Sequence, residues 1–481
     1  MYRAPPLEYA GRELRDYLPE SILREGRLIP LIPPPGLPEI KDVAGAFLKA
    51  VTSSSTPDRC PSLKEILEKF YKGGAVAIIV DDHTRTNHHT RLLLPHLLNF
   101  LLSYGVGRES IRLVVATGTH RAPLEKEMPG ILGSAWPEYR DNVVIHNDKK
   151  GLARVGTLDD GSVVEVNNTV FSSEVCIPLN DLEYHYFAGI AGGPKQICPG
   201  VCGAEIIRIE HLKMFGELGF APGVESGSAD GNPVFEYKKK VVGMFLDEMR
   251  KKGSWVYALT AVMDPEARLV WLEGGDLMET HRRAFDALGK VYIARVREPA
   301  DVVIISARQT GINLYQSGKA YNAAKKAVKK GGHILLLSEC RDGFGNEEFK
   351  GLMAVSAPIF HELEARLGST GEEEAERLKN EYIDRAMRET QMVVMSDFKI
   401  GKQKPVDLLD ILKHTGYGHL WIIQDGLKPD EERLVPLVQV GNKAEPVEDR
   451  LRRWIEQMEH QGKPTYCVIP DPNLLVRAGW K

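Results

Sequence analysis

Residues 74–82 read Gly-Ala-Val-Ala-Ile-Ile-Val-Asp-Asp, an uninterrupted apolar run that ends in two aspartates. Further apolar runs of this kind recur along the chain, namely residues 111–116, 301–306 and 332–338. Continuous β-branched runs are typical of strands that are buried on both faces of a parallel sheet. Helical stretches are expected between them, namely residues 91–104, 277–288 and 317–330. This alternation predicts two α/β domains with mainly parallel sheets, whose ligands gather at the carboxyl ends of the strands.

The length of 481 residues suits two large domains or three smaller ones. Residues 290–299, between an expected helix and an expected strand, are the predicted boundary. We therefore predict an N-terminal domain over residues 1–290 and a C-terminal domain over residues 291–481, with the last residues packing back on the first domain. The charged stretch 371–380 is expected to form a solvated helix face, and the segment around 356–402 has no assigned role.

The composition excludes several classes of protein. A net charge of −4 offers no basic field for a polyanion, so nucleic-acid binding is not expected. Six scattered cysteines are too few for a disulfide scaffold. The N-terminus has no apolar core of a secretion signal, and no stretch approaches the roughly 20 apolar residues of a membrane span. We expect a cytoplasmic protein without membrane partners.

Two polar loops follow the first two apolar runs. Residues 81–85 read Asp-Asp-His-Thr-Arg, which can present hydrogen-bond donors and a fixed positive charge to an anion. A helix-capping turn is the alternative. Residues 117–121 contain His120, a candidate general acid or base, although a histidine bonded to nearby backbone is the commoner finding.

The most informative segment is the glycine-rich stretch from His185 to Gly203, which contains Lys195 and precedes His211. Glycines allow a backbone to approach a ligand closely, and a glycine loop that enters a helix can hold a phosphate. The stretch is neither a P-loop nor a dinucleotide fingerprint. A glycine-rich turn with a solvent-facing lysine is the alternative interpretation.

A fourth segment lies in the predicted second domain. It reads Asn-Leu-Tyr-Gln-Ser-Gly-Lys over residues 313–319, and Gln316 and Lys319 are three positions apart. On a helix they therefore lie on one face. An ordinary surface lysine is the alternative for Lys319.

In their order and spacing, these four segments resemble the nickel-dependent lactate racemase family, whose members carry a nickel pincer nucleotide. The family has an Asp-x-Thr-Arg loop, a Gly-x-His-Arg loop, a His-x-Phe-Ala-Gly-x-x-Gly-Gly-x-Lys stretch with a histidine on the next helix, and a Leu-Tyr-Gln-x-x-Lys segment. The resemblance covers about residues 40–350. It implies an active-site cleft between the two domains, with the first binding the cofactor and the second closing on the substrate.

The resemblance also implies a role for each matching residue. Lys195 would hold the cofactor, pyridinium-3,5-bisthiocarboxylic acid mononucleotide, through a thioamide, and His211 would ligate nickel. The other implied roles fall to residues of the four segments: Asp82, His83, Thr84 and Arg85 at the cofactor, Arg85, Gln316 and Lys319 at the substrate, and His120 and His185 as bases.

The family's chemistry explains the need for two histidines. The hydrogen on the α-carbon of a 2-hydroxy acid leaves as hydride to the cofactor while a base takes the hydroxyl proton, and hydride return to either face inverts the centre. One imidazole serves each enantiomer. The resemblance thus implies an isomerase, a racemase or epimerase of a 2-hydroxy acid that depends on cofactor-biosynthesis enzymes as partners.

Two departures from the family pattern bear on the substrate. Residues 86–89, Thr-Asn-His-His, stand where the family has proline, and residues 309–312, Gln-Thr-Gly-Ile, replace Pro-Lys-Asp. These replacements indicate a substrate larger or more polar than lactate. The alternatives are a nucleotide- or cofactor-binding protein of the same fold without racemase activity, and an NAD-dependent dehydrogenase, which the absent dinucleotide fingerprint disfavours.

Overall fold

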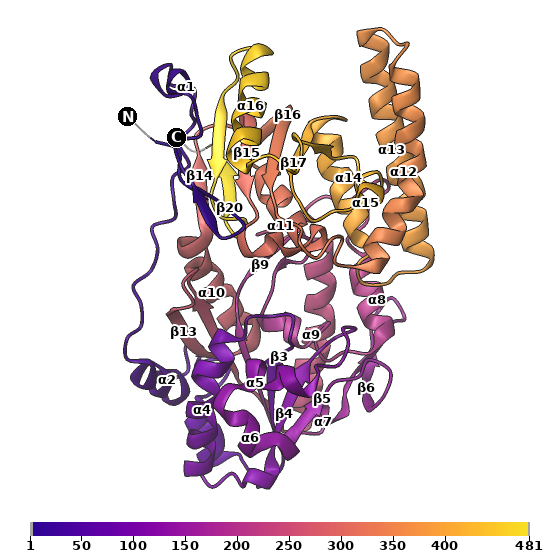
Figure 1. Ribbon diagram of the computed structural model, residues 1–481. Helices are drawn as coiled ribbons and strands as arrows, with labels where there is room; N and C mark the ends of the chain where they lie inside the picture. Colours follow the sequence, from indigo (N-terminus) through magenta and orange to yellow (C-terminus); the bar gives the residue numbers. More distant parts are fainter. Residues whose placement is uncertain (1–2, 480–481) are drawn as a thin grey trace. The chain divides into compact units, whose positions relative to one another are not determined.

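The computed structural model describes residues 3–479 and divides into two compact units. The central unit comprises Pro35–Met214 and Gly223–Val291. The terminal unit comprises Met1–Pro34, Phe215–Pro222 and Tyr292–Lys481, so it is built from both ends of the chain. Figure 1 shows both units and labels many of their elements. Each unit is a mixed α/β structure with a mainly parallel sheet, which confirms the predicted fold class.

The central unit has a sheet with the strand order β13-β12-β8-β3-β4-β5, in which β11 also pairs with β8. Only β13 runs antiparallel to its neighbour. Its strands are β3 (Val76–Asp81), β4 (Ile111–Ala116), β5 (Val143–Ile145), β8 (Val175–Asp181), β11 (Trp255–Val256), β12 (Ala258–Met263) and β13 (Leu269–Gly275). Two hairpins lie outside this sheet, β6 (Leu152–Thr157) with β7 (Val163–Asn167) and β9 (Tyr184–His185) with β10 (Gly189–Ile190).

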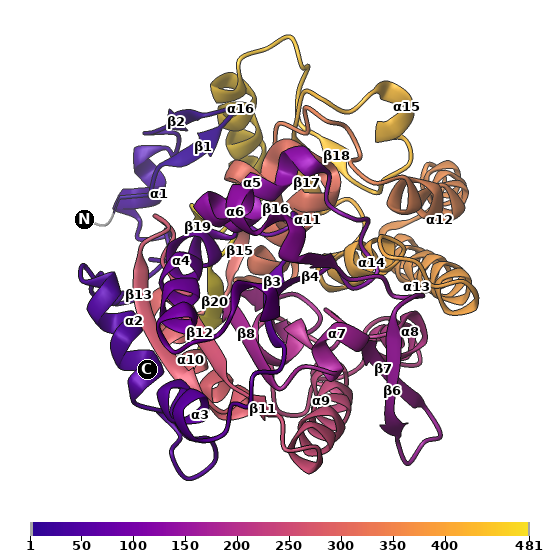
Figure 2. The same cartoon turned by 90° about the horizontal axis from the view of Figure 1, so that it is seen from below.

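The helices of the central unit cover both faces of this sheet. They are α2 (Val43–Thr52), α3 (Leu63–Lys69), α4 (His88–Ser103), α5 (Met128–Leu132), α6 (Trp136–Tyr139), α7 (Asn168–Phe171), α8 (Ala204–Leu212), α9 (Pro233–Lys251) and α10 (Leu277–Tyr292). Figure 2 shows α4 and α9 on opposite sides of the strands.

Strand β3 shows why the apolar run forms this structure. Successive side chains of a strand point to opposite faces. Val76, Ile78 and Val80 belong to the core under α4, whereas Ala77 and Ile79 belong to the core under α9. All five are fully buried. A strand covered on both faces has no position for a polar side chain, which confirms the interpretation of the run.

The terminal unit repeats this plan with the all-parallel order β18-β17-β16-β15-β19. Its strands are β15 (Ala300–Ser306), β16 (Val328–Leu337), β17 (Leu420–Ile423), β18 (Val438–Gln439) and β19 (Tyr466–Ile469), beside the pairs β1 (Leu7–Tyr9) with β2 (Arg12–Leu14) and β14 (Ile293–Val296) with β20 (Leu475–Ala478). Its helices are α1 (Glu20–Arg24), α11 (Leu314–Lys325), α12 (Glu347–Leu367), α13 (Glu372–Ser396), α14 (Gln403–Thr415), α15 (Pro429–Glu432) and α16 (Val447–His460).

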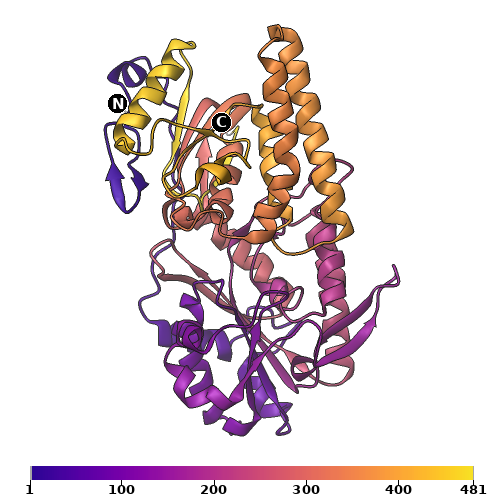
Figure 3. The same ribbon diagram turned by 45° about the vertical axis from the view of Figure 1, so that its right-hand side comes forward.

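The segment around 356–402 consists largely of the helices α12 and α13, which lie side by side as a long hairpin (Figure 3). The charged stretch 371–380 forms the start of α13 and is mostly exposed, as predicted.

One helix prediction was wrong at its end. The helix expected over 317–330 stops at Lys325, and β16 already begins at Val328, which pairs with Ala300 of β15. Strand pairing in the sheet therefore overrides the helix-favouring lysines of this stretch. Among residues 3–479, every helix is too short or too polar to span a lipid bilayer.

Candidate functional site

The polar residues of the central unit gather where three parallel strands end. Strand β3 pairs with β4 up to Asp81↔Ala116, and β8 lies on its other side. Because the strands are parallel, the loops that follow them leave the same edge of the sheet. The Asp-Asp-His-Thr-Arg loop, the His120 loop and the glycine-rich stretch after β8 are therefore neighbours.

Asp82 and His120 form a pair that joins two of these loops. The carboxylate Oδ2 of Asp82 lies 2.7 Å from Nδ1 of His120. Its other oxygen accepts hydrogen bonds from the amide (3.0 Å) and the hydroxyl (2.6 Å) of Thr84. Burial raises the pKa of Asp82, but these bonds and His120 outweigh it and hold that pKa below its usual value. An ionised Asp82 accepts from Nδ1–H and leaves the Nε2 lone pair of His120 to act as a base.

Arg85 and Glu183 bring a charge pair to the same edge. A guanidinium nitrogen of Arg85 lies 3.6 Å from a carboxylate oxygen of Glu183, and the Arg85 side chain is one-quarter exposed. Burial lowers the pKa of Arg85, but Glu183 and the aspartates Asp81, Asp82 and Asp181 raise it above its usual value. Arg85 therefore stays charged and can bind an anion.

The glycine-rich stretch is tied to both neighbouring strand ends. The amide of Gly193 donates to the side chain of Asn180 (2.8 Å), and the Gln196 side chain donates to Asp81 (3.0 Å). Gly192 has φ +76°, and a Cβ there would lie 2.0 Å from the carbonyl oxygen of Asp181, so only glycine fits. The amide of Gly118, in the His120 loop, donates to the carbonyl of Gly200 (2.9 Å). This bond fixes the loops of His120 and Lys195 against each other.

Lys195 lies on the short 3-10 turn Gly193–Gln196 within this stretch. Desolvation lowers the pKa of its amine well below the usual value, and the positive charges of Arg85 and Lys238 lower it further. Glu210 and Glu183 oppose this shift without reversing it. A lowered pKa favours the neutral form of the amine, in which a lysine is a nucleophile.

His211 lies on α8 with its ring orientation fixed by its neighbours. Its Nδ1 donates to the carbonyl of Ile207 (2.8 Å) and lies 2.8 Å from a carboxylate oxygen of Glu210. A carbonyl only accepts, so the neutral ring carries its lone pair on Nε2, as a metal-ligating histidine requires. Burial raises the pKa of Glu210, but His211 and Lys238 lower it below its usual value. Lys238 is fully buried, 3.5 Å from Glu210.

Of the remaining predicted site residues, three belong to the central unit and two to the terminal unit. His185 lies on β9, packs edge-on against Phe187 (4.5 Å between ring centres), and Phe187 in turn lies 5.3 Å from the ring of His211. His83 is half-buried and Thr84 is exposed beside Asp82. Gln316 and Lys319 belong to the terminal unit, near the start of α11, where Gln316 is half-buried and Lys319 exposed.

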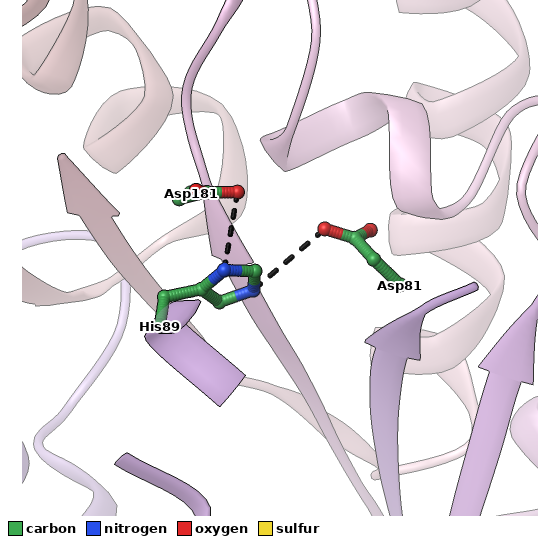
Figure 4. Close-up of side chains that lie close together, drawn as sticks. All are labelled: Asp81, His89 and Asp181. Carbon is green, nitrogen blue, oxygen red and sulfur yellow. Dashed lines mark ion pairs between the residues drawn. The ribbon is translucent and has the colours of Figure 1, made fainter. Parts of the chain in front are cut away.

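Sequence reasoning missed a largely buried cluster of Asp81, His89 and Asp181 (Figure 4). Burial and the charge of Asp181 raise the pKa of Asp81 to about 6, although His89 opposes this. Burial lowers the pKa of His89, but the two aspartates raise it to about 9. Asp81 and Asp181 are the last residues of two paired strands, which is the signal that could have identified them. Glu210 and Lys238 were also missed, and nothing in their sequence context marks them.

Two protein-family models match this chain, and their bounds agree only in part with those of the two units. The family model for the lactate racemase N-terminal domain matches residues 21–220, and the model for the lactate racemase C-terminal domain matches residues 296–404. The chain belongs to the lactate racemase family. The resemblance seen in the four segments is thereby confirmed.

Two curated lactate racemases show how distant the relationship is. That of Thermoanaerobacterium thermosaccharolyticum is 28% identical over 278 residues, which cover 57% of this chain and 62% of the relative. That of Lactiplantibacillus plantarum is 26% identical over 288 residues, which cover 59% of this chain and 64% of the relative. Each match therefore spans less than two thirds of the relative's length.

Solved structures extend the likeness of fold to the whole chain. The lactate racemase apoprotein from Thermoanaerobacterium thermosaccharolyticum superposes with a TM-score of 0.73 at 21% identity, covering 98% of this chain and 99% of that one. A protein from Thermotoga maritima gives a TM-score of 0.58 at 17% identity, covering 86% and 96%. At these identities the likeness supports the shared fold alone.

Asn232 connects the start of α9 to the loop that carries His185. Its side chain accepts from the amide of Val234 (3.0 Å) and donates to the buried carbonyl of Phe187 (2.9 Å). We expect Asn232→Ala to lower the free energy of unfolding by about 2–4 kcal/mol, because it removes a helix cap and leaves a buried carbonyl without a donor. Urea denaturation measures this, with Asn147→Ala, at an exposed turn, as the control. A loss no larger than the control's contradicts this role.

His281 on α10 packs against the glycine-rich stretch, since a Cβ on Gly193 would lie 2.6 Å from its ring. Burial, with the nearby charge of Lys238, lowers the pKa of His281 to about 3. Protonation then favours the unfolded chain, where the pKa is about 6.5, so stability present above pH 6.5 is lost as the pH falls toward 3. At pH 5 this loss is about 2 kcal/mol. We expect His281→Gln to flatten the dependence of unfolding free energy on pH between 6.5 and 4 relative to the wild type. Equal slopes in wild type and His281→Gln would contradict the assignment.

Proposed function

We propose that this protein racemises or epimerises a 2-hydroxy acid with a nickel pincer nucleotide attached to Lys195. The observation that supports this best is that a lysine suited to covalent attachment and a candidate base lie on two loops that are hydrogen-bonded to each other. The partly desolvated amine of Lys195 has a lowered pKa, and its loop is hydrogen-bonded to the loop of His120. Family membership supports the same activity. Two curated relatives are named as lactate racemases, and the match to the lactate racemase N-terminal domain, residues 21–220, includes all of the proposed residues of the central unit.

The residues of the central unit fit the cofactor chemically. A neutral lysine amine can form a thioamide, and an imidazole whose Nδ1 donates to a carbonyl presents Nε2 to nickel. Lys195 would hold the nucleotide and His211 would ligate the metal, while Asp82, His83, Thr84 and Arg85 line the nucleotide. When bound, this group supplies an acceptor for the hydrogen of the substrate's α-carbon. Cofactor-building enzymes of the cytoplasm are the proposed source of the group.

The chain's own residues then handle the proton and the carboxylate. His120, oriented by the ionised Asp82, takes the hydroxyl proton of one enantiomer and gives a proton back to the keto oxygen when that same enantiomer re-forms. His185 does the same for the other enantiomer. Arg85 holds the substrate carboxylate by its fixed charge. Gln316 and Lys319 are proposed to contact the substrate from the C-terminal domain, and the polar residues 86–89 favour a substrate more hydroxylated than lactate.

Substitutions can separate the attachment of the cofactor to Lys195 from the binding of nickel by His211. In protein co-produced with the cofactor-building enzymes, we expect intact-mass spectrometry to detect an adduct that Lys195→Ala abolishes and that Lys251→Ala, at an exposed helix position, retains. His211→Ala should keep the adduct and lose nickel in metal analysis, because its imidazole is the only protein ligand proposed for that ion. An adduct that survives in Lys195→Ala would contradict the tether.

Turnover tests the two-base scheme. We expect His120→Ala to keep adduct and nickel but to lower kcat by about 10²–10⁴-fold, the usual contribution of a positioned base. Asp82→Asn should lower kcat in the same direction, because an amide does not fix the imidazole tautomer as a carboxylate does. Chiral chromatography over a panel of 2-hydroxy acids measures both enantiomers. Full activity of His120→Ala on both would overturn the scheme, and binding without inversion in the wild type would favour a cofactor carrier.

A further inference from the structure

We propose that Asp81, His89 and Asp181 form a binding site for a divalent transition-metal ion, of which Zn²⁺ is the best match. One ligand atom from each residue lies within 4.8 Å of the others. The residues come from the ends of the paired strands β3 and β8 and from the second residue of α4. None of the three is assigned to holding the cofactor or moving a proton in the proposed racemase chemistry, and the site does not depend on that function.

The ring of His89 provides the first argument. Its side chain is fully buried (0% exposed) and lies between the two carboxylates, as Figure 4 shows. Nε2 lies 3.0 Å from the hydroxyl of Thr90, which can accept its hydrogen. In the neutral ring this tautomer leaves the lone pair on Nδ1, and Nδ1 lies 3.2 Å from an oxygen of Asp181. A cation is needed between these two atoms, and a metal ion would replace the proton that the raised pKa of His89 otherwise keeps there.

The alignment of these atoms favours a metal ion over a shared proton. Within residues 3–479, Nδ1 of His89 makes no hydrogen bond of good geometry, although the Asp181 oxygen lies only 3.2 Å away. The oxygen therefore lies off the axis of the nitrogen lone pair. A chelated ion requires such an offset, because a metal about 2.1 Å from each ligand holds neighbouring ligands roughly 3 Å apart without placing them in line.

The donor set and the surroundings indicate which ion fits. One imidazole and two carboxylates suit a borderline cation such as Zn²⁺ better than Mg²⁺ or Ca²⁺, which prefer oxygen alone. Asp81 faces His89 with one oxygen, 3.7 Å from Nε2, and its other oxygen accepts from Gln196 (3.0 Å), as an outer-shell partner would hold it. Two carboxylates and a neutral imidazole carry a charge of −2, which the ion neutralises.

Zinc binding by the chain made without cofactor-building enzymes tests the proposal. After treatment with EDTA, we expect equilibrium dialysis with Zn²⁺ to give one ion per chain, and at least tenfold weaker binding in His89→Gln and Asp181→Asn. His96→Gln, a histidine on the same helix, should bind as the wild type does. His211→Ala should also bind normally, because its histidine belongs to the nickel site. Absence of stoichiometric zinc in the wild type, or its loss in His211→Ala, would overturn the assignment.

A measurement on the unaltered chain covers the case in which a buried variant fails to fold. X-ray absorption at the zinc edge should find only nitrogen and oxygen ligands. Sulfur ligands would place the ion at the buried cysteines Cys198 and Cys202 instead and would overturn the proposal. Because no cofactor is present in these samples, zinc binding can succeed or fail independently of racemase activity.

Discussion

Parallel pairing of β3 with both β4 and β8 determines where the chemistry of this protein can take place. Parallel strands end at one edge, so the three loops that follow them meet there. Strand β3 itself is apolar on both faces from Val76 to Val80 and leaves no position for a functional group along that length. Hydrogen bonds from Gly193 to Asn180 and from Gly118 to Gly200 then connect the loops into one rigid group.

The electrostatics of this edge depend on burying opposite charges together. Ion pairs out of water are stable only when their partners compensate for lost hydration. Arg85 is surrounded by carboxylates and stays charged, whereas Lys195 has cations nearby and tends to lose its proton. At one sheet edge, the surroundings thus raise the pKa of Arg85 and lower the pKa of Lys195. The difference suits one of them for binding anions and the other for forming a covalent bond.

Several features of this arrangement were predictable from the sequence. A strand that is buried on both faces needs a continuous apolar run, and a backbone that is approached closely needs glycine. Both patterns can be recognised in the sequence alone. The pairing of Asp82 with His120 was not, because the two residues are 38 positions apart and only the parallel register brings them together. Lys238 stands in a run of three lysines, and its burial follows from helix rotation against the sheet. His89 was noticed only as a departure from the family pattern, since its carboxylate partners lie on two different strands.

The terminal unit combines segments from both ends of the chain. Arg27 makes a two-pronged ion pair with Glu459, and the amide of Tyr466 donates to the carbonyl of Arg27 (2.8 Å). During synthesis, Arg27 leaves the ribosome long before Glu459 and Tyr466 are made. The central unit ends at Val291, so all of its residues have been made before these two partners. Domains that emerge whole can fold as they appear. The segment around Arg27 can therefore complete its contacts only after the last part of the terminal unit has been made.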